Sequence, residues 1–485
     1  WILDHHRAEW IQFNTARWSS FMGKIIRGIR GAGRDAAFNS AWTKDPLEAI
    51  YRYGSDYKAF VDAGATSFIV EDVSADLAIL ADEDVGYPMG YAHRKFVHHE
   101  FAAALMAIKA HLPDTALTPL FMIRDTLEQW DVIHHMPVAM QRAAATNLNN
   151  YLVRGDRRIE PVTNGPHFCL ADGLTPEEWR FTRIAWDNGY TVPYAVPGVT
   201  AVWSDQRMHA ELDALIKTRR WHTAKWMAEL ASRGAPVHKI ARIEDIGAVE
   251  GPLLVINPDL LPPEELEKAL AYKGGPVLLL GGQVDAGRKS RFEIVMENGW
   301  GRTVFAGYGA MPAYESRIFR DDSRPKKDIA AMREPEGAVW THPLAYADIG
   351  DGFVRSCVEI LTDLTGYPTV SNDNGACHVA AVYTGPDSMR LFVENEEYYY
   401  ALPWVETGWE IVRAEAITKP EGYPLRVEGG RFKLRVPGRG MDIVDIRFKE
   451  KQLHLKDNNN IKKNNHRECC RNIPGILQNT EAENQ

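Results

Sequence analysis

The chain has 485 residues, a formal net charge of −9 and 45% hydrophobic residues. This apolar share excludes a disordered or collagen-like chain, and the length predicts two or three domains. Acidic residues outnumber basic ones by 65 to 56, which argues against a nucleic-acid partner. No apolar run reaches the roughly 18–20 residues that span a bilayer, so no membrane partner is expected.

The chain begins at Trp1, and no charged-then-apolar signal segment follows it. Apolar residues at helical spacing run from Glu9 to about Arg30. We therefore expect the true amino terminus to precede Trp1, and a cytoplasmic location is favoured. Five cysteines, two of them adjacent at 469 and 470, form neither a disulfide framework nor a CxxC metal motif.

Strand-like and helix-like segments alternate from residue 35 to about 195. Short β-rich runs cover 36–42, 66–72, 116–123 and 166–173. Helical patterns lie between them, at 46–62, 93–110 and 129–145, and another begins with the capping box at 175–178. This alternation predicts a parallel sheet of the βα-barrel type, which carries its chemistry at the carboxyl ends of the strands. Fewer than eight strands are present, so residues 1–197 are interpreted as a partial barrel.

Two further domains are expected. Residues 198–335 alternate strands at 199–203, 236–243, 253–256 and 275–281 with helices at 209–232 and from 262, which predicts a small doubly wound α/β domain. It contains no cysteine, so the nucleophile of a glutamine amidotransferase is absent. Short alternating runs within 336–448 predict an antiparallel β domain. The Asn- and Lys-rich residues 449–485 are expected to be disordered.

Three carboxylates are candidate catalytic groups. Glu71 and Asp72 close the strongest strand pattern, and Asp172 follows another strand. At such positions in a barrel, carboxylates serve as general acids, bases or nucleophiles. The structural alternatives stay open, because Glu71 and Asp72 could cap a helix or hold an arginine. The pair Asp172-Gly173 is also typical of a turn.

Six further residues are candidates for binding substrate: Asn39, Trp42, Arg124, Asp125, Trp130 and His167. Arginine, aspartate and asparagine can hydrogen-bond sugar hydroxyls, and tryptophan can stack on a sugar ring. A buried core role explains Trp42 nearly as well.

Adjacent histidines occur at 5–6, 98–99 and 134–135. Metal ligands on one helix are usually three or four residues apart, and adjacent side chains point in different directions. HExxH is absent. The sequence therefore predicts no metal site, and no cofactor is required.

The order of barrel, cysteine-free amidotransferase-like domain and small β domain resembles family 42 glycoside hydrolases, the beta-galactosidase type. Residues 36–42 resemble the entry to the third barrel strand, and residues 66–72 resemble the fourth. The resemblance implies a retaining glycosidase acting on an oligosaccharide or glycoside, with Glu71 as acid/base. Val70 stands where that family usually has asparagine, and Asp172 is the nearest candidate for the partner carboxylate, with Asp72 in reserve. It also implies a homotrimer assembled through residues 199–335.

A second interpretation remains open. A chain that kept the barrel and lost the nucleophile would be a non-catalytic carbohydrate-binding or assembly protein. Two carboxyl groups facing each other across the barrel mouth would favour the enzyme, because glycoside hydrolysis uses such a pair.

Overall fold

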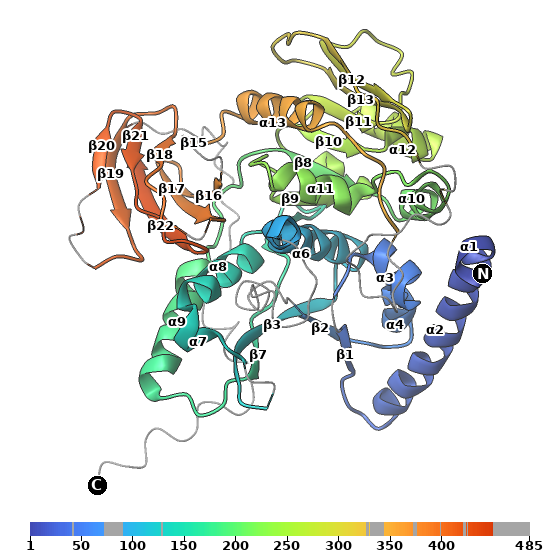
Figure 1. Ribbon diagram of the computed structural model, residues 1–485, viewed down its shortest axis with the longest axis horizontal. Helices are drawn as coiled ribbons and strands as arrows, with labels where there is room; N and C mark the ends of the chain where they lie inside the picture. The colour runs from blue at the N-terminus through green and yellow to red at the C-terminus, as the bar shows by residue number, and fades with distance from the viewer. Residues whose placement is uncertain are drawn as a thin grey trace.

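The structure is a computed structural model that describes residues 1–40, 43–71, 91–127, 130–325, 344–371, 376–397, 399–420 and 425–449, together with 329 and 423. It is a mixed α/β protein with a parallel sheet, a larger mixed sheet and an antiparallel β domain (Figure 1). None of the helices in these ranges is both long and apolar enough to cross a membrane. The tail expected to be disordered lies outside the described residues, apart from Lys449.

The first sheet confirms the predicted parallel strands. Its strands are β1 (Ala37–Ser40), β2 (Ser67–Glu71), β3 (Ala116–Asp125), β4 (Trp130–Asp131) and β7 (His167–Leu170). Strands β1, β2, β3 and β7 are parallel neighbours in this order, and β4 pairs antiparallel with the end of β3. Within the described ranges no pairing joins β1 to β7, so this sheet is open.

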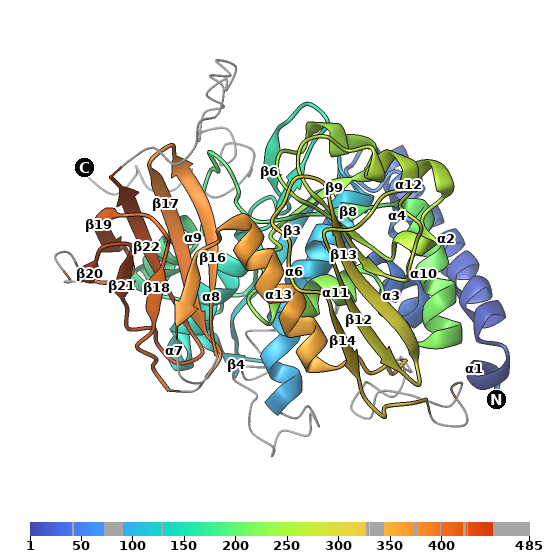
Figure 2. The ribbon, with the colours of Figure 1, turned by 90° about the horizontal axis from the view of Figure 1, so that it is seen from above.

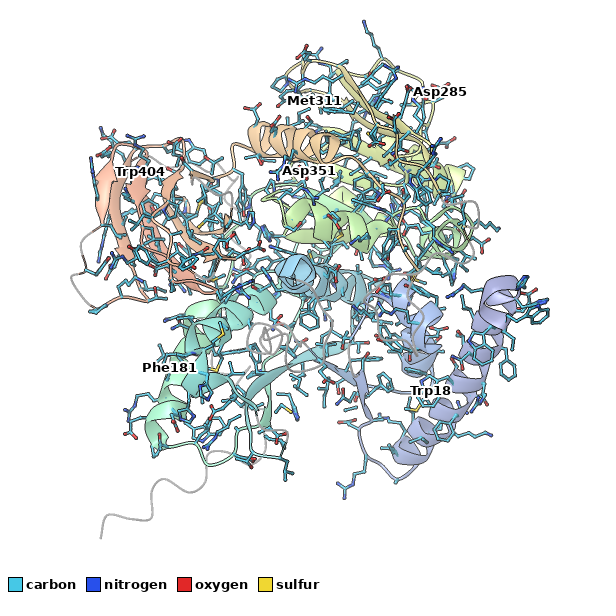
Figure 3. The ribbon with its side chains drawn as sticks, in the orientation of Figure 1. Trp18, Phe181, Asp285, Met311, Asp351 and Trp404 are labelled. Carbon is cyan, nitrogen blue, oxygen red and sulfur yellow. The ribbon has the colours of Figure 1, made fainter. Side chains whose placement is uncertain are left out.

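Helices surround this sheet and begin where the sequence predicts. They are α1 (Ile2–His5), α2 (Arg7–Gly31), α3 (Pro46–Tyr53), α4 (Tyr57–Asp62), α6 (Tyr91–His111), α7 (Val132–His135), α8 (Pro137–Leu148) and α9 (Pro176–Gly189). Asp45 caps α3, and Thr175 with Glu178 forms the predicted capping box of α9. Trp18 on α2 and Phe181 on α9 mark opposite flanks of the sheet (Figure 3).

The second sheet has nine strands, in the order β14-β12-β13-β11-β10-β8-β9-β5-β6. They are β5 (Tyr151–Val153), β6 (Ile159–Pro161), β8 (Thr200–Trp203), β9 (Lys239–Arg242), β10 (Leu253–Ile256), β11 (Val277–Gly281), β12 (Phe292–Asn298), β13 (Gly301–Tyr308) and β14 (Arg317–Arg320). The five strands from β11 to β5 are parallel to one another. Apolar clusters cover both faces, which is the doubly wound arrangement expected of this region.

Two expectations for this region need correction. The hairpin β5–β6, assigned by the sequence to the first domain, pairs with β9 and so belongs to the second sheet. The helix expected at 209–232 is two helices, α10 (Asp205–Thr218) and α11 (Thr223–Ala231). Arg219 between them has a φ of 61°, a left-handed conformation that ends α10.

The remaining helices are α12 (Pro263–Leu270), α13 (Asp351–Thr365) and the 3₁₀ turns η2 (Ile243–Ala248) and η3 (Pro258–Leu260). Although α13 falls within the range predicted for the β domain, it packs on β12 and α11 of the second sheet (Figure 2). Helix α6 lies at the centre of the molecule, between the two sheets (Figure 1). One apolar cluster includes residues of α6, α11 and both sheets, so the two α/β parts share a core.

The predicted antiparallel β domain is present. Its strands are β15 (Thr369–Ser371), β16 (Cys377–Gly385), β17 (Ser388–Asn395), β18 (Trp404–Glu406), β19 (Ile411–Ala416), β20 (Arg426–Glu428), β21 (Arg431–Lys433) and β22 (Met441–Phe448). They form two four-stranded sheets, β15-β18-β21-β20 and β16-β17-β22-β19, around one apolar core. Trp404 marks the first of these sheets in Figure 3.

Candidate active site at the carboxyl edge of the parallel sheet

Glu71 is the last residue of β2, at the edge where parallel strands expose their carboxyl ends. Phe68 and Val70 of the same strand are buried in the core shared with α3, α4 and α6. Because side chains alternate along a strand, Glu71 lies on the other face, and it is half-buried there. The Glu71 N–H donates to the Thr43 hydroxyl at 2.8 Å, which ties the end of β2 to the segment after β1.

Asp172 lies just beyond β7 and is held against the end of β3. Its Oδ2 accepts from the Thr126 N–H at 3.2 Å and from the Thr126 hydroxyl at 2.9 Å. The Arg124 guanidinium donates to its main-chain carbonyl at 3.1 Å. Leu170 and Ala171, directly before it, have φ values of 57° and 44°, which non-glycine residues rarely adopt. Backbone strain of this kind often accompanies a functional position.

The sheet register gives the relative position of Glu71 and Asp172. Glu71 is level with Leu120 of β3, and His167 of β7 is level with the same residue. Asp172, in contrast, bonds to Arg124 and Thr126. Four residues separate Leu120 from Arg124, which corresponds to about 13 Å along a strand at ~3.3 Å per residue. The Asp172 backbone therefore lies well beyond that of Glu71 in the strand direction.

A charged network at the same edge escaped the sequence analysis. The Arg124 Nε lies 3.2 Å from Asp131 Oδ2, and His134 Nδ1 lies 2.7 Å from the same oxygen. The other ring nitrogen of His134 contacts the Glu178 carboxylate. Hydrogen bonds to Asp131 and then to Glu178 raise the pKa of His134 above its ordinary value. The network therefore joins β3, β4, α7 and α9.

Local signals for this network were present in the sequence but pointed elsewhere. Glu178 was assigned to the capping box of α9, and it performs that role as well. His134 was considered only as one of an adjacent pair. Asp131 also caps α7 through the His134 N–H, at 3.2 Å. Each residue thus has a local role that hides its contacts with distant elements.

The other candidate residues are distributed along the same sheet. Asn39 is exposed on β1 and His167 on β7, while Asp125 is buried and accepts from the Leu127 N–H at 2.7 Å. Trp130 pairs through its backbone with Asp125. Trp42 and Asp72 lie outside the described residues.

No family model and no curated protein matches the chain. Solved structures that resemble it are glycoside hydrolases. A GH42 beta-galactosidase, Gan42B, has a TM-score of 0.47 and 11% identity over 91% of this chain and 68% of its own. An exo-carrageenase of GH42 from Bacteroides ovatus has a TM-score of 0.35 and 8% identity over 73% of this chain. This chain spans 44% of the exo-carrageenase.

Members of other families are also similar. A rhamnosidase from Novosphingobium sp. PP1Y has a TM-score of 0.39 and 9% identity, over 84% of this chain and 40% of its own. The neighbours thus include the family that the sequence resembles. Because every TM-score here is below 0.5, the functional argument rests on the geometry of the site.

Proposed function

We propose that this chain is a glycoside hydrolase in which Glu71 is the general acid/base and Asp172 is the second carboxylate. The observation that supports it best is the position of Glu71: it ends a parallel strand, on the face turned away from the surrounding helices. Carboxylates at this edge of βα-barrels reach bound substrate. We further infer that β1, β2, β3 and β7 are part of such a barrel.

Glycoside hydrolysis needs one carboxyl group to protonate the leaving oxygen and another to attack or to activate water. In the proposal, Glu71 gives its proton to the glycosidic oxygen as the bond to the anomeric carbon breaks. Direct attack requires carboxyl groups about 5–5.5 Å apart, whereas activation of water requires about 6.5–9.5 Å. The register offset between Glu71 and Asp172 favours the wider arrangement. Asp172 is therefore assigned to water activation, in place of the retaining attack that the family resemblance implies.

Polar residues along the edge would hold the sugar. Arg124 is fixed by Asp131 and by the Asp172 carbonyl, so its remaining guanidinium hydrogens have a defined direction. Asn39 and His167 are exposed on flanking strands. Asp125, Trp42 and Trp130 complete the proposed binding set, with the tryptophans stacking on sugar rings. The substrate class is an oligosaccharide or glycoside, with β-galactosides as the first to test.

The decisive experiment compares leaving groups. Glu71→Gln should lower kcat for a phenyl β-galactoside by about 10²–10⁴-fold, because the departing oxygen then lacks its acid. A dinitrophenyl β-galactoside needs little protonation, so its bond-breaking step should be much less affected. Glu264→Gln, at an exposed position on α12, is the matched control and should behave as wild type. Equal losses on both substrates, or no loss, would contradict the assignment of Glu71 as general acid.

A second function has one observation in its favour. The Asp172 carboxylate is already engaged by both polar groups of Thr126. A chain in which this carboxylate only supports the loop would bind carbohydrate without cleaving it. Calorimetric binding of an oligosaccharide that stays intact after prolonged incubation would favour that function over the hydrolase.

A further inference from the structure

Four buried side chains meet where the β domain contacts the central helix. His98 and His99 are on α6, Glu394 is on β17, and Glu396 follows that strand directly. Their side chains are between 3% and 10% exposed. They lie away from the proposed active edge, on the opposite side of the core that α6 shares with the second sheet (Figure 1).

The ligand atoms of these four residues converge. His98 Nε2 lies 2.8 Å from Glu394 Oε2 and 3.9 Å from Glu396 Oε1. His99 Nε2 lies 3.3 Å from Glu394 Oε1 and 3.1 Å from Glu396 Oε1. One ligand atom from each residue can be chosen so that all four lie within 4.8 Å of one another. Two imidazole nitrogens and two carboxylates therefore surround a single point.

The expectation that adjacent histidines point apart is wrong for this pair. The ring centroids of His98 and His99 are 4.0 Å apart, with an angle of 37° between the planes. Glu394 and Glu396 are two residues apart, the spacing that places side chains on one side of an extended chain. The carboxylates can therefore meet two neighbouring imidazoles that flank the line of contact on the helix.

We propose that His98, His99, Glu394 and Glu396 bind one divalent transition-metal ion, with zinc as the best fit. Zinc takes imidazole and carboxylate ligands at about 2.0–2.2 Å in a tetrahedron, whose edges are then about 3.4 Å. The four nitrogen–oxygen separations, from 2.8 to 3.9 Å, bracket that edge. Calcium and magnesium prefer all-oxygen sets, which this site does not offer.

Charge supports the same conclusion. Two carboxylates this close together and this deeply buried repel each other, and burying each of them costs several kcal/mol. A divalent cation between them neutralises both. His378 Nε2 lies 3.9 Å from Glu396 Oε2, on the side away from the histidine pair, and would orient that ligand from outside.

The space beside the cluster suits an ion and not a sugar. The cavity has a volume of about 40 Å³, and its lining includes His98, His99, His238, His378, Glu394 and Asn150. A water molecule needs about 10–15 Å³ on this measure. Four protein ligands leave no position for substrate, so the ion would be structural and would fasten β17 to α6.

Zinc content tests the proposal directly. The full chain is purified, incubated with zinc chloride, dialysed against metal-free buffer and measured by plasma mass spectrometry. We expect one zinc per chain in the wild type and none in Glu394→Gln/Glu396→Gln. The control is His111→Asn, also on α6, whose histidine pairs with the single carboxylate of Asp205 at 2.7 Å. It should keep its zinc.

Two measurements keep the test valid if the double variant fails to fold. Cobalt added to the metal-free wild type should give the visible absorption of a tetrahedral nitrogen–oxygen site. His378→Ala, which spares all four ligands, should weaken zinc binding by about 10–100-fold. A wild-type chain without stoichiometric zinc or a cobalt spectrum would overturn the proposal, and the cluster would then be a metal-free His–Glu hydrogen-bond network. Zinc retained in the folded double variant would overturn it as well.

Discussion

The Nε2 atom of His98 lies 2.8 Å from Oε2 of Glu394, although 296 residues separate the two along the chain. His98 belongs to the helix at the centre of both α/β sheets, and Glu394 to the β domain. The contact is buried, so the β domain meets the α/β core through ionisable groups as well as apolar ones. Its loss would affect the position of one domain against the other.

The stereochemistry of the reaction tests the role of Asp172. Because the register sets Asp172 well beyond Glu71, we expect water to attack and the anomeric configuration to invert. Proton NMR of the first product formed, recorded before mutarotation, distinguishes the anomers. Retention would exclude Asp172 as a water-activating base and would require a closer carboxylate as nucleophile. The leaving-group test of Glu71 would be unaffected by either result.

Removal of the Arg207 side chain should strongly destabilise the second sheet. Arg207 is fully buried and donates to the carbonyl oxygens of Ile256 and Val202 at 2.7 and 2.5 Å. It also lies 3.6 Å from the buried Glu211. Arg207→Ala leaves that carboxylate without its cation, so the free energy of unfolding should fall by about 3–5 kcal/mol.

Urea unfolding followed by circular dichroism measures this change. The matched control is Lys217→Ala on the same helix, which breaks an exposed pair with Asp213. That pair should contribute less than about 1 kcal/mol. Similar effects of the two substitutions would show that the buried network does not stabilise the sheet.

His222 should make stability depend on pH. Its Nε2 lies 3.0 Å from Asp45 Oδ2, and its Nδ1 lies 3.2 Å from the Tyr346 hydroxyl. Burial by itself would lower the pKa of His222, but the charges of Asp45, Glu48 and Glu211 raise it above its ordinary value. Folding therefore favours the protonated form of this side chain.

The direction of the effect follows from that shift. Below the unfolded pKa, about 6.5, the ion pair contributes its full stabilisation, and this is lost as pH rises through the higher folded pKa. The difference in melting temperature between wild type and His222→Asn should therefore be largest below pH 6.5 and shrink in alkaline buffer. His209→Asn, at an exposed position on α10, is the control. A constant or growing difference would contradict the sign of the shift.

Assembly through the second sheet is a separate prediction. The family resemblance implies a homotrimer built on residues 199–335. Strand β14 is an edge of the nine-stranded sheet, and its Ile318 is 55% exposed. Sedimentation equilibrium at micromolar concentration should give three chain masses for the wild type and fewer for Ile318→Arg. Val412→Arg, at a similarly exposed position in the β domain, should not change the mass. A monomeric wild type would contradict the prediction.

Local patterns in the sequence predicted much of the fold. The parallel strands that contain Phe68 and Leu254 read as apolar runs, and the caps at Asp45 and Thr175 mark helix starts correctly. Each signal depends on residues within a few positions of one another, so it survives in the linear sequence. The hairpin at 151–161 was missed because its strands are three residues long and its partner, β9, lies some eighty positions later.

The candidate sites show the same division. The sequence by itself determined that Glu71 ends a strand, because alternation and the β-branched run before it are local. Only the tertiary structure decided that Asp172 lies beyond Glu71 along the sheet, since register depends on which strands pair. The meeting of His98 and His99 with Glu394 and Glu396 was likewise decided by tertiary packing. It depends on the docking of a β domain onto one helix, and no spacing rule within a single element contains that information.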